Sequence, residues 1–220
     1  HCDCICERHG VSPFGAAFYK IFGKYLENYT EHGYNTLYTP LFTPPLDTDY
    51  GTERQTIQLV DVFRTENGWR FGFSRLKRFM DFAKKHGVKY FEFSHLFSQG
   101  GAEYAPKIVA RENGGEVKLF GWKTRSDDGD YLEFLSCFLK ELHQFLFANR
   151  FAGRCFCHIS DEPKIEHIGR YAKLQGIVRK YFPDVPVIDA LSDPDFASEK
   201  LVDYPVAGSH RADEFAEKGT

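Results

Sequence analysis

Apolar residues recur at every third or fourth position in several stretches of the chain, the spacing that gathers them on one face of an α-helix. The first of these helices is predicted to follow Ser12 and Pro13, which are typical of a helix start, and to end before Gly33. The later helices are predicted within 76–83, 131–146, 165–178, 195–200 and 212–218. Shorter runs with the composition of strands separate them, at 1–5, 35–39, 89–94, 154–157, 185–190 and 204–208. Strands and helices therefore alternate, which favours a parallel sheet covered by helices.

Two long connections, 41–72 and 95–128, interrupt this alternation. In the first, strand-like runs flank the turn Asn67-Gly68, and in the second they flank Asn113-Gly114-Gly115. Such turns between apolar runs are strong signals of a β-hairpin. Long structured insertions after a strand are typically functional.

We interpret the chain as an α/β protein with the architecture of a TIM-type (β/α)8 barrel. A complete barrel uses about 250 residues, and about six strand–helix units can be counted here. We therefore expect a single catalytic barrel domain over residues 1–220 that is incomplete at both ends, running from about strand 1 to helix 6. An open doubly wound sheet ranks second, because no glycine-rich phosphate loop follows the first predicted strand.

Charge and composition narrow the classes of molecule that the protein is expected to bind. The chain has 28 basic and 31 acidic residues and a formal net charge of −3, which gives no general attraction to nucleic acid and suits a neutral polar substrate. No run is long and apolar enough to cross a bilayer, so we expect no membrane insertion, and no signal peptide is visible. Most of the 22 Phe and 12 Tyr residues follow helix faces and are expected in the core, although a few could be platforms for a sugar.

The six cysteines contain no C-x-x-C pair, so their spacing does not suggest a zinc site. On the predicted strands, Cys2, Cys4, Cys155 and Cys157 occupy alternate positions and are expected to be small apolar wall residues. The spacing leaves disulfides open. We expect no metal and no cofactor.

The clearest candidate chemistry lies in the stretch 158–163, where a predicted strand leads into a helix opened by Pro163. In barrels of this type the active site lies at that end of the strands. Glu162, partly desolvated and beside another carboxylate, would have a raised proton affinity and suits the general acid of glycoside cleavage. The simpler alternative is that Asp161 caps the helix and Glu162 lies in its first turn.

Adjacent carboxylates do not suit the usual retaining pair, whose carboxyl groups lie about 5 Å apart across the sugar. They do suit an acid and an assistant. If the substrate carries a 2-acetamido group, its carbonyl oxygen can attack the anomeric carbon while Asp161 accepts the amide proton.

Several motifs, in one order along nearly the whole chain, carry a family resemblance. They are HCDC at 1–4, LFTPPLDT at 41–48, QLVDV at 58–62, HLF with Gln99 at 95–99, APKI at 105–108, FGW at 120–122, HISDEP at 158–163 and IDALS at 188–192. With these motifs the chain resembles the catalytic barrel of glycoside hydrolase family 123, the retaining β-N-acetylgalactosaminidases, and related uncharacterised domains.

The resemblance implies Glu162 as general acid and base and Asp161 as the residue that orients the 2-acetamido group on the way to an oxazolinium intermediate. It also implies a glycan or glycolipid substrate with terminal β-linked N-acetylgalactosamine. A β-sandwich domain would precede the barrel in the parent protein, which would be bacterial and secreted, periplasmic or cell-associated. One departure is Gly100, which stands where the family pattern has Trp, so an expected platform ring is missing.

Four further residues fall at or just after predicted strand ends and are candidates for substrate binding: Asp3, His95, Trp122 and Asp189. Each could equally be a supporting or core residue. His158 is interpreted as a wall histidine and not as a ligand. Two alternatives to the substrate-assisted hydrolase stay open at this point. One is a retaining glycosidase with a nucleophile beyond residue 220, and the other is a non-catalytic carbohydrate-binding barrel.

Overall fold

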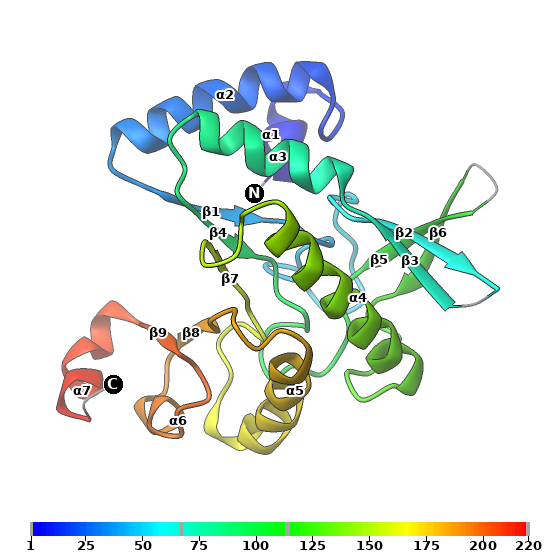
Figure 1. Cartoon of the computed structure of the whole chain (residues 1–220). Coiled ribbons are helices and arrows are strands. Elements are labelled where there is room, and N and C mark those ends of the chain that lie inside the picture. Colours follow the sequence, from blue (N-terminus) through cyan, green and yellow to red (C-terminus); the bar gives the residue numbers. More distant parts are fainter. Residues whose placement is uncertain (1, 67, 113–114, 219–220) are drawn as a thin grey trace.

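The computed structural model describes residues 2–66, 68–112 and 115–218 (Figure 1). Its helices are α1 (Cys2–His9), α2 (Ala16–Glu31), α3 (Ser74–Lys85), α4 (Gly129–Ala148), α5 (Ile168–Tyr181), α6 (Pro194–Ser198) and α7 (Ala212–Glu217). Its strands are β1 (Thr36–Thr39), β2 (Asp61–Thr65), β3 (Gly68–Gly72), β4 (Tyr90–Phe93), β5 (Ile108–Glu112), β6 (Gly115–Phe120), β7 (Cys155–Phe156), β8 (Ile188–Leu191) and β9 (Tyr204–Ala207). The mixed α/β fold that the sequence predicts is thus confirmed.

A parallel sheet organises the fold. The strands β1, β4 and β7 pair in that order, and β8 pairs with β9, also in parallel. A parallel bridge between Cys157 and Val187 links the two sets just beyond the end of β7. The order β1-β4-β7-β8-β9 follows the chain without reversal, whereas a doubly wound sheet reverses at a switch point. The described strands do not close on themselves, so no closed barrel is present among them.

The first segment differs from its prediction. Residues 2–5 belong to helix α1 and not to a strand, so that prediction is wrong; His1 lies outside the described residues. Cys2 and Cys6 are buried one helical turn apart, whereas Cys4 between them is exposed. Alternation over five residues is too short to distinguish a strand from a helix. As a consequence, β7 is the third of the parallel strands and not the fourth. Separately, all six cysteines are free thiols.

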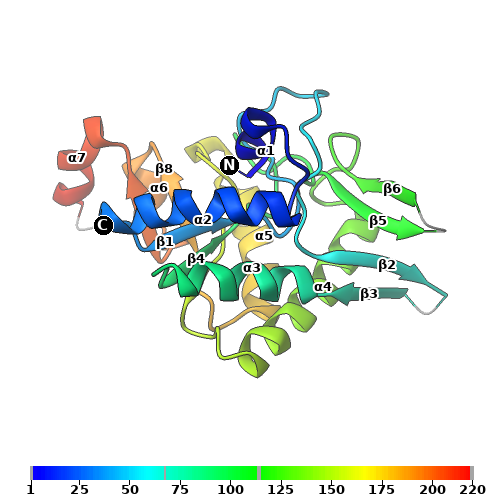
Figure 2. The same ribbon diagram turned by 90° about the horizontal axis from the view of Figure 1, so that it is seen from above.

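The two long connections form the expected antiparallel hairpins, β2–β3 and β5–β6. Their predicted turn residues Asn67, Asn113 and Gly114 lie outside the described residues. Both hairpins project from the same side of the molecule, and β2 lies against β5 (Figures 1 and 2). The two insertions therefore pack against each other beside the parallel sheet.

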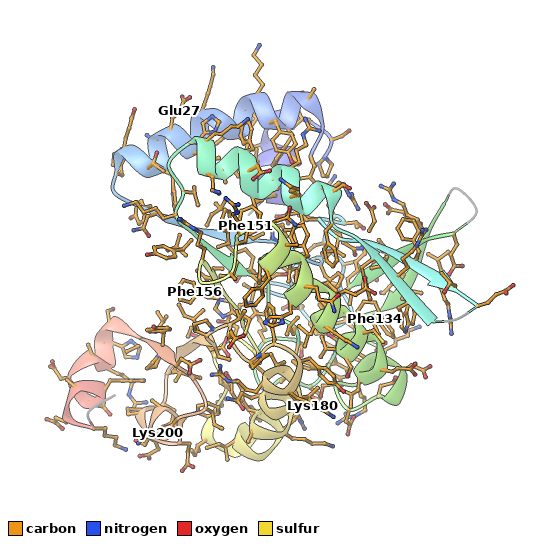
Figure 3. All side chains as sticks on the ribbon, viewed as in Figure 1. Glu27, Phe134, Phe151, Phe156, Lys180 and Lys200 are labelled. Atoms are coloured by element: carbon orange, nitrogen blue, oxygen red, sulfur yellow. The ribbon has the colours of Figure 1, made fainter. Side chains whose placement is uncertain are left out.

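Aromatic side chains fill the interior, as their helical spacing predicts. Phe22 of α2 stacks on Phe79 of α3, with ring centroids 5.2 Å apart. Phe134 on α4 packs against Phe120 at 5.1 Å, and Phe151, which follows α4, packs against Phe91 of the sheet at 5.8 Å (Figure 3). Burial of each ring contributes roughly 1.5–3 kcal/mol. None of the described helices is both long and apolar enough to span a membrane.

The segment after β7 also differs in detail from its prediction. Pro163 does not open a helix: a single 3-10 turn covers Ile165–His167, and α5 begins at Ile168. The residue that precedes α5 is His167, so Asp161 is not its N-cap. The capping alternative for the carboxylate pair is therefore wrong, and the pair lies in an irregular segment between strand and helix.

Candidate active site

The backbone of 157–161 continues the line of β7 beyond the end of its pairing. It runs beside the segment that follows β4, because the amide of Phe97 donates to the carbonyl of Ile159 at 3.1 Å. Further on, the amide of Gly100 donates to the carbonyl of Asp161 at 2.9 Å. The fold thus carries Asp161 and Glu162 to the carboxyl ends of the parallel strands, where the sequence predicts them.

The two adjacent carboxylates have different environments. Asp161 is half-buried, and burial, the charge of Glu162 and the charge of Asp189 raise its pKa to about 6. Glu162 is exposed, with a backbone φ of 45° in the left-handed region. The desolvation that the sequence suggests for Glu162 therefore falls on Asp161. A side chain other than glycine in that region costs about 1–3 kcal/mol and is common at functional sites.

Three residues before Asp161, His158 is buried and has both ring nitrogens hydrogen-bonded. Its Nδ1 lies 2.7 Å from Oδ1 of Asp189, and its Nε2 lies 2.6 Å from Oε1 of Glu92 on β4. An ionised carboxylate only accepts, so both nitrogens donate and the ring is an imidazolium. Burial alone opposes that charge, but the two carboxylates outweigh it and raise the pKa of His158 to about 9. The interpretation of His158 as a wall residue agrees with this burial.

Asp189 of β8 is fully buried, with 0% of its surface exposed. Its Oδ2 accepts from the amides of Ile159 at 3.2 Å and Ser160 at 3.4 Å, and from the hydroxyl of Tyr171 on α5. Burial raises the pKa of Asp189, and the hydrogen bond from His158 opposes this. In this structure Asp189 supports the strand end and does not present its oxygens at the surface.

His95 follows β4 and is also buried, at 3% exposure. Its ring stacks on His158 with centroids 4.0 Å apart, and its Nδ1 lies 3.3 Å from the hydroxyl of Tyr38 on β1. Burial and the charge of His158 hold the pKa of His95 well below its usual range, so its ring is neutral. Its Nε2 is buried without a hydrogen-bond partner among the described residues and lies 3.8 Å from Asp189.

This cluster has the residue types of a metal site but not the arrangement. His95, His158 and Asp189 each bring one possible ligand atom within 4.8 Å of the others. The lone pairs of imidazole lie in the ring plane, and the two rings stack with their planes only 25° apart. Both ring nitrogens of His158 are already hydrogen-bonded to carboxylates, so this imidazolium has no lone pair left for a metal ion. We interpret the cluster as a hydrogen-bonded network.

The remaining two candidates lie in other parts of the structure. Asp3, on α1, forms an ion pair with Arg54 at 2.6 Å, and Arg54 also donates to the carbonyl of Leu46 at 2.6 Å. Asp3 therefore anchors the long connection after β1, although the predicted strand that would have placed it at a strand end does not exist.

Trp122 belongs to an aromatic cluster with Tyr50 and Tyr104. Their ring centroids lie 5.7 and 6.0 Å from that of Trp122, and the indole N–H donates to the carbonyl of Thr52 at 2.8 Å. Tyr50 is 66% exposed. Because Tyr104 ends the loop whose residue Gly100 binds the carbonyl of Asp161, this aromatic cluster and the carboxylate pair are built on the same set of loops. At Gly100 itself, where the resemblance leads us to expect Trp, a side chain would enter open space.

Comparison with known proteins now decides the family. The model of the glycoside hydrolase 123 catalytic domain matches residues 1–220. The chain belongs to this family. The matched range covers the network, the carboxylate pair and both hairpins, and the resemblance inferred from the motifs is confirmed. No curated protein sequence matches the chain.

A solved structure of the same family has a similar fold. It is a family 123 glycoside hydrolase from Clostridium perfringens, whose structural analysis concerns the hydrolysis of glycolipid glycans. It superimposes on the whole of this chain with a TM-score of 0.72 at 11% identity. The match covers 40% of that protein, so the present chain spans less than half of its length. A glycosyl hydrolase family 2 member from Bacteroides cellulosilyticus shares 13% identity at a TM-score of 0.33, over 74% of this chain and 26% of its own, a likeness too weak to support an argument.

Sequence reasoning missed Glu92, Tyr38 and Tyr171, which complete the network around His158 and Asp189. Glu92 had a usable signal, because it is a charged residue between the aromatic residues of the run 90–93. Tyr38 and Tyr171 had none, since each lies in a predicted strand or helix, where a core position is the ordinary expectation for an aromatic residue.

Proposed function

We propose that this chain is the catalytic domain of a retaining glycoside hydrolase that releases terminal β-linked N-acetylgalactosamine by substrate-assisted catalysis. The observation that carries the proposal is the pair of adjacent carboxylates at the end of β7, of which Asp161 is half-buried and Glu162 exposed. Two titratable groups in contrasting environments are typical of divided catalytic roles. Adjacent side chains also cannot lie on opposite faces of one sugar, which favours an acid and an assistant.

In the first step, Glu162 donates a proton to the glycosidic oxygen as the bond from that oxygen to the anomeric carbon breaks. The acetamido carbonyl oxygen of the substrate forms the new bond to the anomeric carbon, giving an oxazolinium ion. Asp161, as a carboxylate, accepts a hydrogen bond from the acetamido N–H and stabilises the positive charge. Its raised pKa makes it a stronger acceptor than an ordinary Asp.

In the second step, water attacks the anomeric carbon and gives its proton to the Glu162 carboxylate. The oxazoline ring opens, and the acetamido group is restored. Two successive inversions at the anomeric carbon leave the configuration retained. Every proton in this scheme moves through Glu162, whereas Asp161 holds the amide.

We propose that Trp122, with Tyr50 and Tyr104, offers a sugar face a stacking surface. Aromatic rings with a polar edge suit the alternating polar and apolar faces of a pyranose. His95, Asp189 and Asp3 take part in binding only indirectly, through the segments that they hold. Glycolipid glycans are the proposed substrate class, supported by the substrate of the C. perfringens relative.

We also propose the barrel as the complete architecture around this site. Five parallel strands in chain order, with helices α2, α3, α4 and α5 outside them, support it (Figures 1 and 2). In such barrels, residues at the ends of several different strands contribute to one site. The network from Tyr38 to Asp189 joins residues that lie on or just after four strands, β1, β4, β7 and β8.

The test is turnover of 4-nitrophenyl N-acetyl-β-galactosaminide by the wild type and three variants. Glu162→Gln should abolish release from substrates with poor leaving groups, and Asp161→Asn should reduce turnover strongly and weaken a thiazoline inhibitor that mimics the oxazoline. The exposed Glu166→Gln, four residues further on, is the matched control and should retain activity. Full activity of Glu162→Gln on a poor leaving group would contradict the proposal, as would a covalent glycosyl-enzyme trapped by a fluorosugar.

A further inference from the structure

We infer that Asp189 is a positioning residue, whose carboxylate holds the backbone that leads to the catalytic pair. The inference rests on the proposed function, in so far as Asp161 and Glu162 are taken as that pair. It assigns to Asp189 no contact with substrate. Its action is on the two residues immediately before Asp161.

Regular strand pairing stops short of the site. The last backbone pairing between β7 and its neighbour joins Cys157 to Val187 and Ile188, where the amide of Ile188 donates to the carbonyl of Cys157 at 3.0 Å. Beyond it, the amides of Ile159 and Ser160 have no strand carbonyl to bind on that side. Both residues are buried, and a buried amide without a partner costs about 1–3 kcal/mol.

The Asp189 side chain takes the place of the missing strand. One oxygen, Oδ2, accepts from both amides, at 3.2 and 3.4 Å, and the other, Oδ1, is held by Nδ1 of His158 at 2.7 Å. Tyr171 on α5 donates to Oδ2 as well. The carboxylate has donors on both oxygens and 0% exposure, so its rotamer is fixed by its surroundings.

The opposite side of the same segment is fixed by Ser160. Its hydroxyl donates to the carbonyl of Ser98 at 2.8 Å and accepts from the amide of Ala102 at 3.1 Å. The segment is thus clamped between β8 on one side and the loop after β4 on the other. Removal of Asp189 releases one side only, and the release begins at the residue next to Asp161.

Replacement of Asp189 also changes the charges around Asp161 and Glu162. The groups that act on Asp161 are Glu162, Asp189, His158 and Asp47, and Tyr38 is near enough for its own pKa to respond to Asp161. Asp189→Ala removes an anion but also one of the two partners of the imidazolium. These effects on the pKa of Asp161 oppose one another. The decisive measurement is therefore the exchange rate of the backbone amides and not a shift of the pH profile.

The experiment measures amide hydrogen exchange and steady-state kinetics in the full-length protein. In Asp189→Ala, the amides of Ile159 and Ser160 should exchange at least about tenfold faster than in the wild type, relative to amides of α4. A displaced reacting group can cost about 100-fold in rate, so kcat on the 4-nitrophenyl substrate should fall by about that factor while KM stays within about threefold.

Asp203→Ala is the matched control. Its carboxylate makes the same type of bond, to the amide of Val187 at 2.6 Å, just before β8 begins and two residues before Asp189. It should lower the melting temperature without a change in kcat or in exchange at Ile159 and Ser160. An equal loss of kcat in both variants would overturn the inference, because it would show a general loss of stability.

If the alanine variant does not fold, Asp189→Asn allows the role of Asp189 to be tested. The amide oxygen of Asn can still accept from both backbone amides, so exchange should stay within about threefold of the wild type and kcat should fall by less than about tenfold. A 100-fold loss of kcat with full protection of both amides would overturn the inference, and so would unchanged exchange in Asp189→Ala. If the wild type releases no 4-nitrophenol, the proposed substrate is wrong, and the exchange rates alone decide whether Asp189 holds the segment.

Discussion

Replacement of Asp161 by Asn should stabilise the folded protein at neutral pH. Its pKa is raised from 3.8 to about 6, with burial as the largest cause and the charge of Glu162 next. The folded protein therefore binds this proton more tightly than the unfolded chain does. The associated stability is fully present below the unfolded pKa and is lost as the pH rises through the folded one. At neutral pH the ionised Asp161 is a net cost to the fold.

The size of that cost follows from the pKa difference. A rise from 3.8 to about 6 is roughly two units, and each unit corresponds to about 1.4 kcal/mol, which gives roughly 3 kcal/mol. Asp161 is only half-buried, and solvent screening reduces this to about 1–2 kcal/mol. For a domain of this size, that gain raises the melting temperature by about 2–8 °C. Asparagine is neutral at every pH and escapes the cost.

The assay is urea unfolding at about pH 4 and about pH 7.5, since the first value lies near the unfolded pKa and the second above the folded one. Asp161→Asn should be more stable than the wild type at the higher pH and nearly equal to it at the lower. The exposed Glu199→Gln controls for loss of one negative charge and should change stability by no more than about 0.5 kcal/mol. An equal gain at both pH values would attribute the effect to packing, and a loss at pH 7.5 would refute the reasoning.

Three further expectations concern activity and the surrounding loops. Since Asp161 must be ionised to accept the acetamido N–H, kcat/KM should rise with pH through an apparent pKa near 6, and a limb at the ordinary pKa of Asp would contradict this. Gly101→Ala should lower the melting temperature, because φ is +127° and the added Cβ would lie 2.8 Å from the His167 ring; an unchanged melting curve would show that the loop adapts freely. Trp122→Ala should raise KM about tenfold or more with kcat nearly unchanged, as loss of a stacked ring costs about 1–3 kcal/mol of uniform binding, and an unaltered KM would remove this ring from the proposed binding surface.

The sequence predicts the elements that depend on the spacing of residues close together in the chain. The spacing of Leu76, Phe79 and Met80 predicts α3, because residues three and four apart share one helix face, and all three are buried. The two hairpins follow from turn residues between apolar runs in the same way. The error at 2–5 has the same origin, since a pattern over so few residues fits two periods.

The site is predicted only as far as one strand end. The residues 158–163 are contiguous, so their place after β7 can be inferred from the sequence. The partners of His158 cannot, because Glu92 lies 66 residues away and Asp189 lies 31 away. Strand order brings them together, and burial then decides their role: Asp189 and His95 fall at predicted strand ends, yet both are buried in the wall beneath the site.

The backbone at Glu162 depends both on its local sequence and on contacts with distant residues. Glycine is the residue that adopts a positive φ at little cost, and this chain instead carries a charged side chain there, at φ 45°. Such a conformation persists where the surrounding structure holds it. The clamp from Asp189 and Ser160 ends one residue before Asp161, and the carbonyl of Asp161 is bound by Gly100, so the backbone is held up to the residue before the strained one. The cost at Glu162 is therefore balanced by a buried network beneath it, which explains why an exposed acid in an irregular segment can keep a defined position.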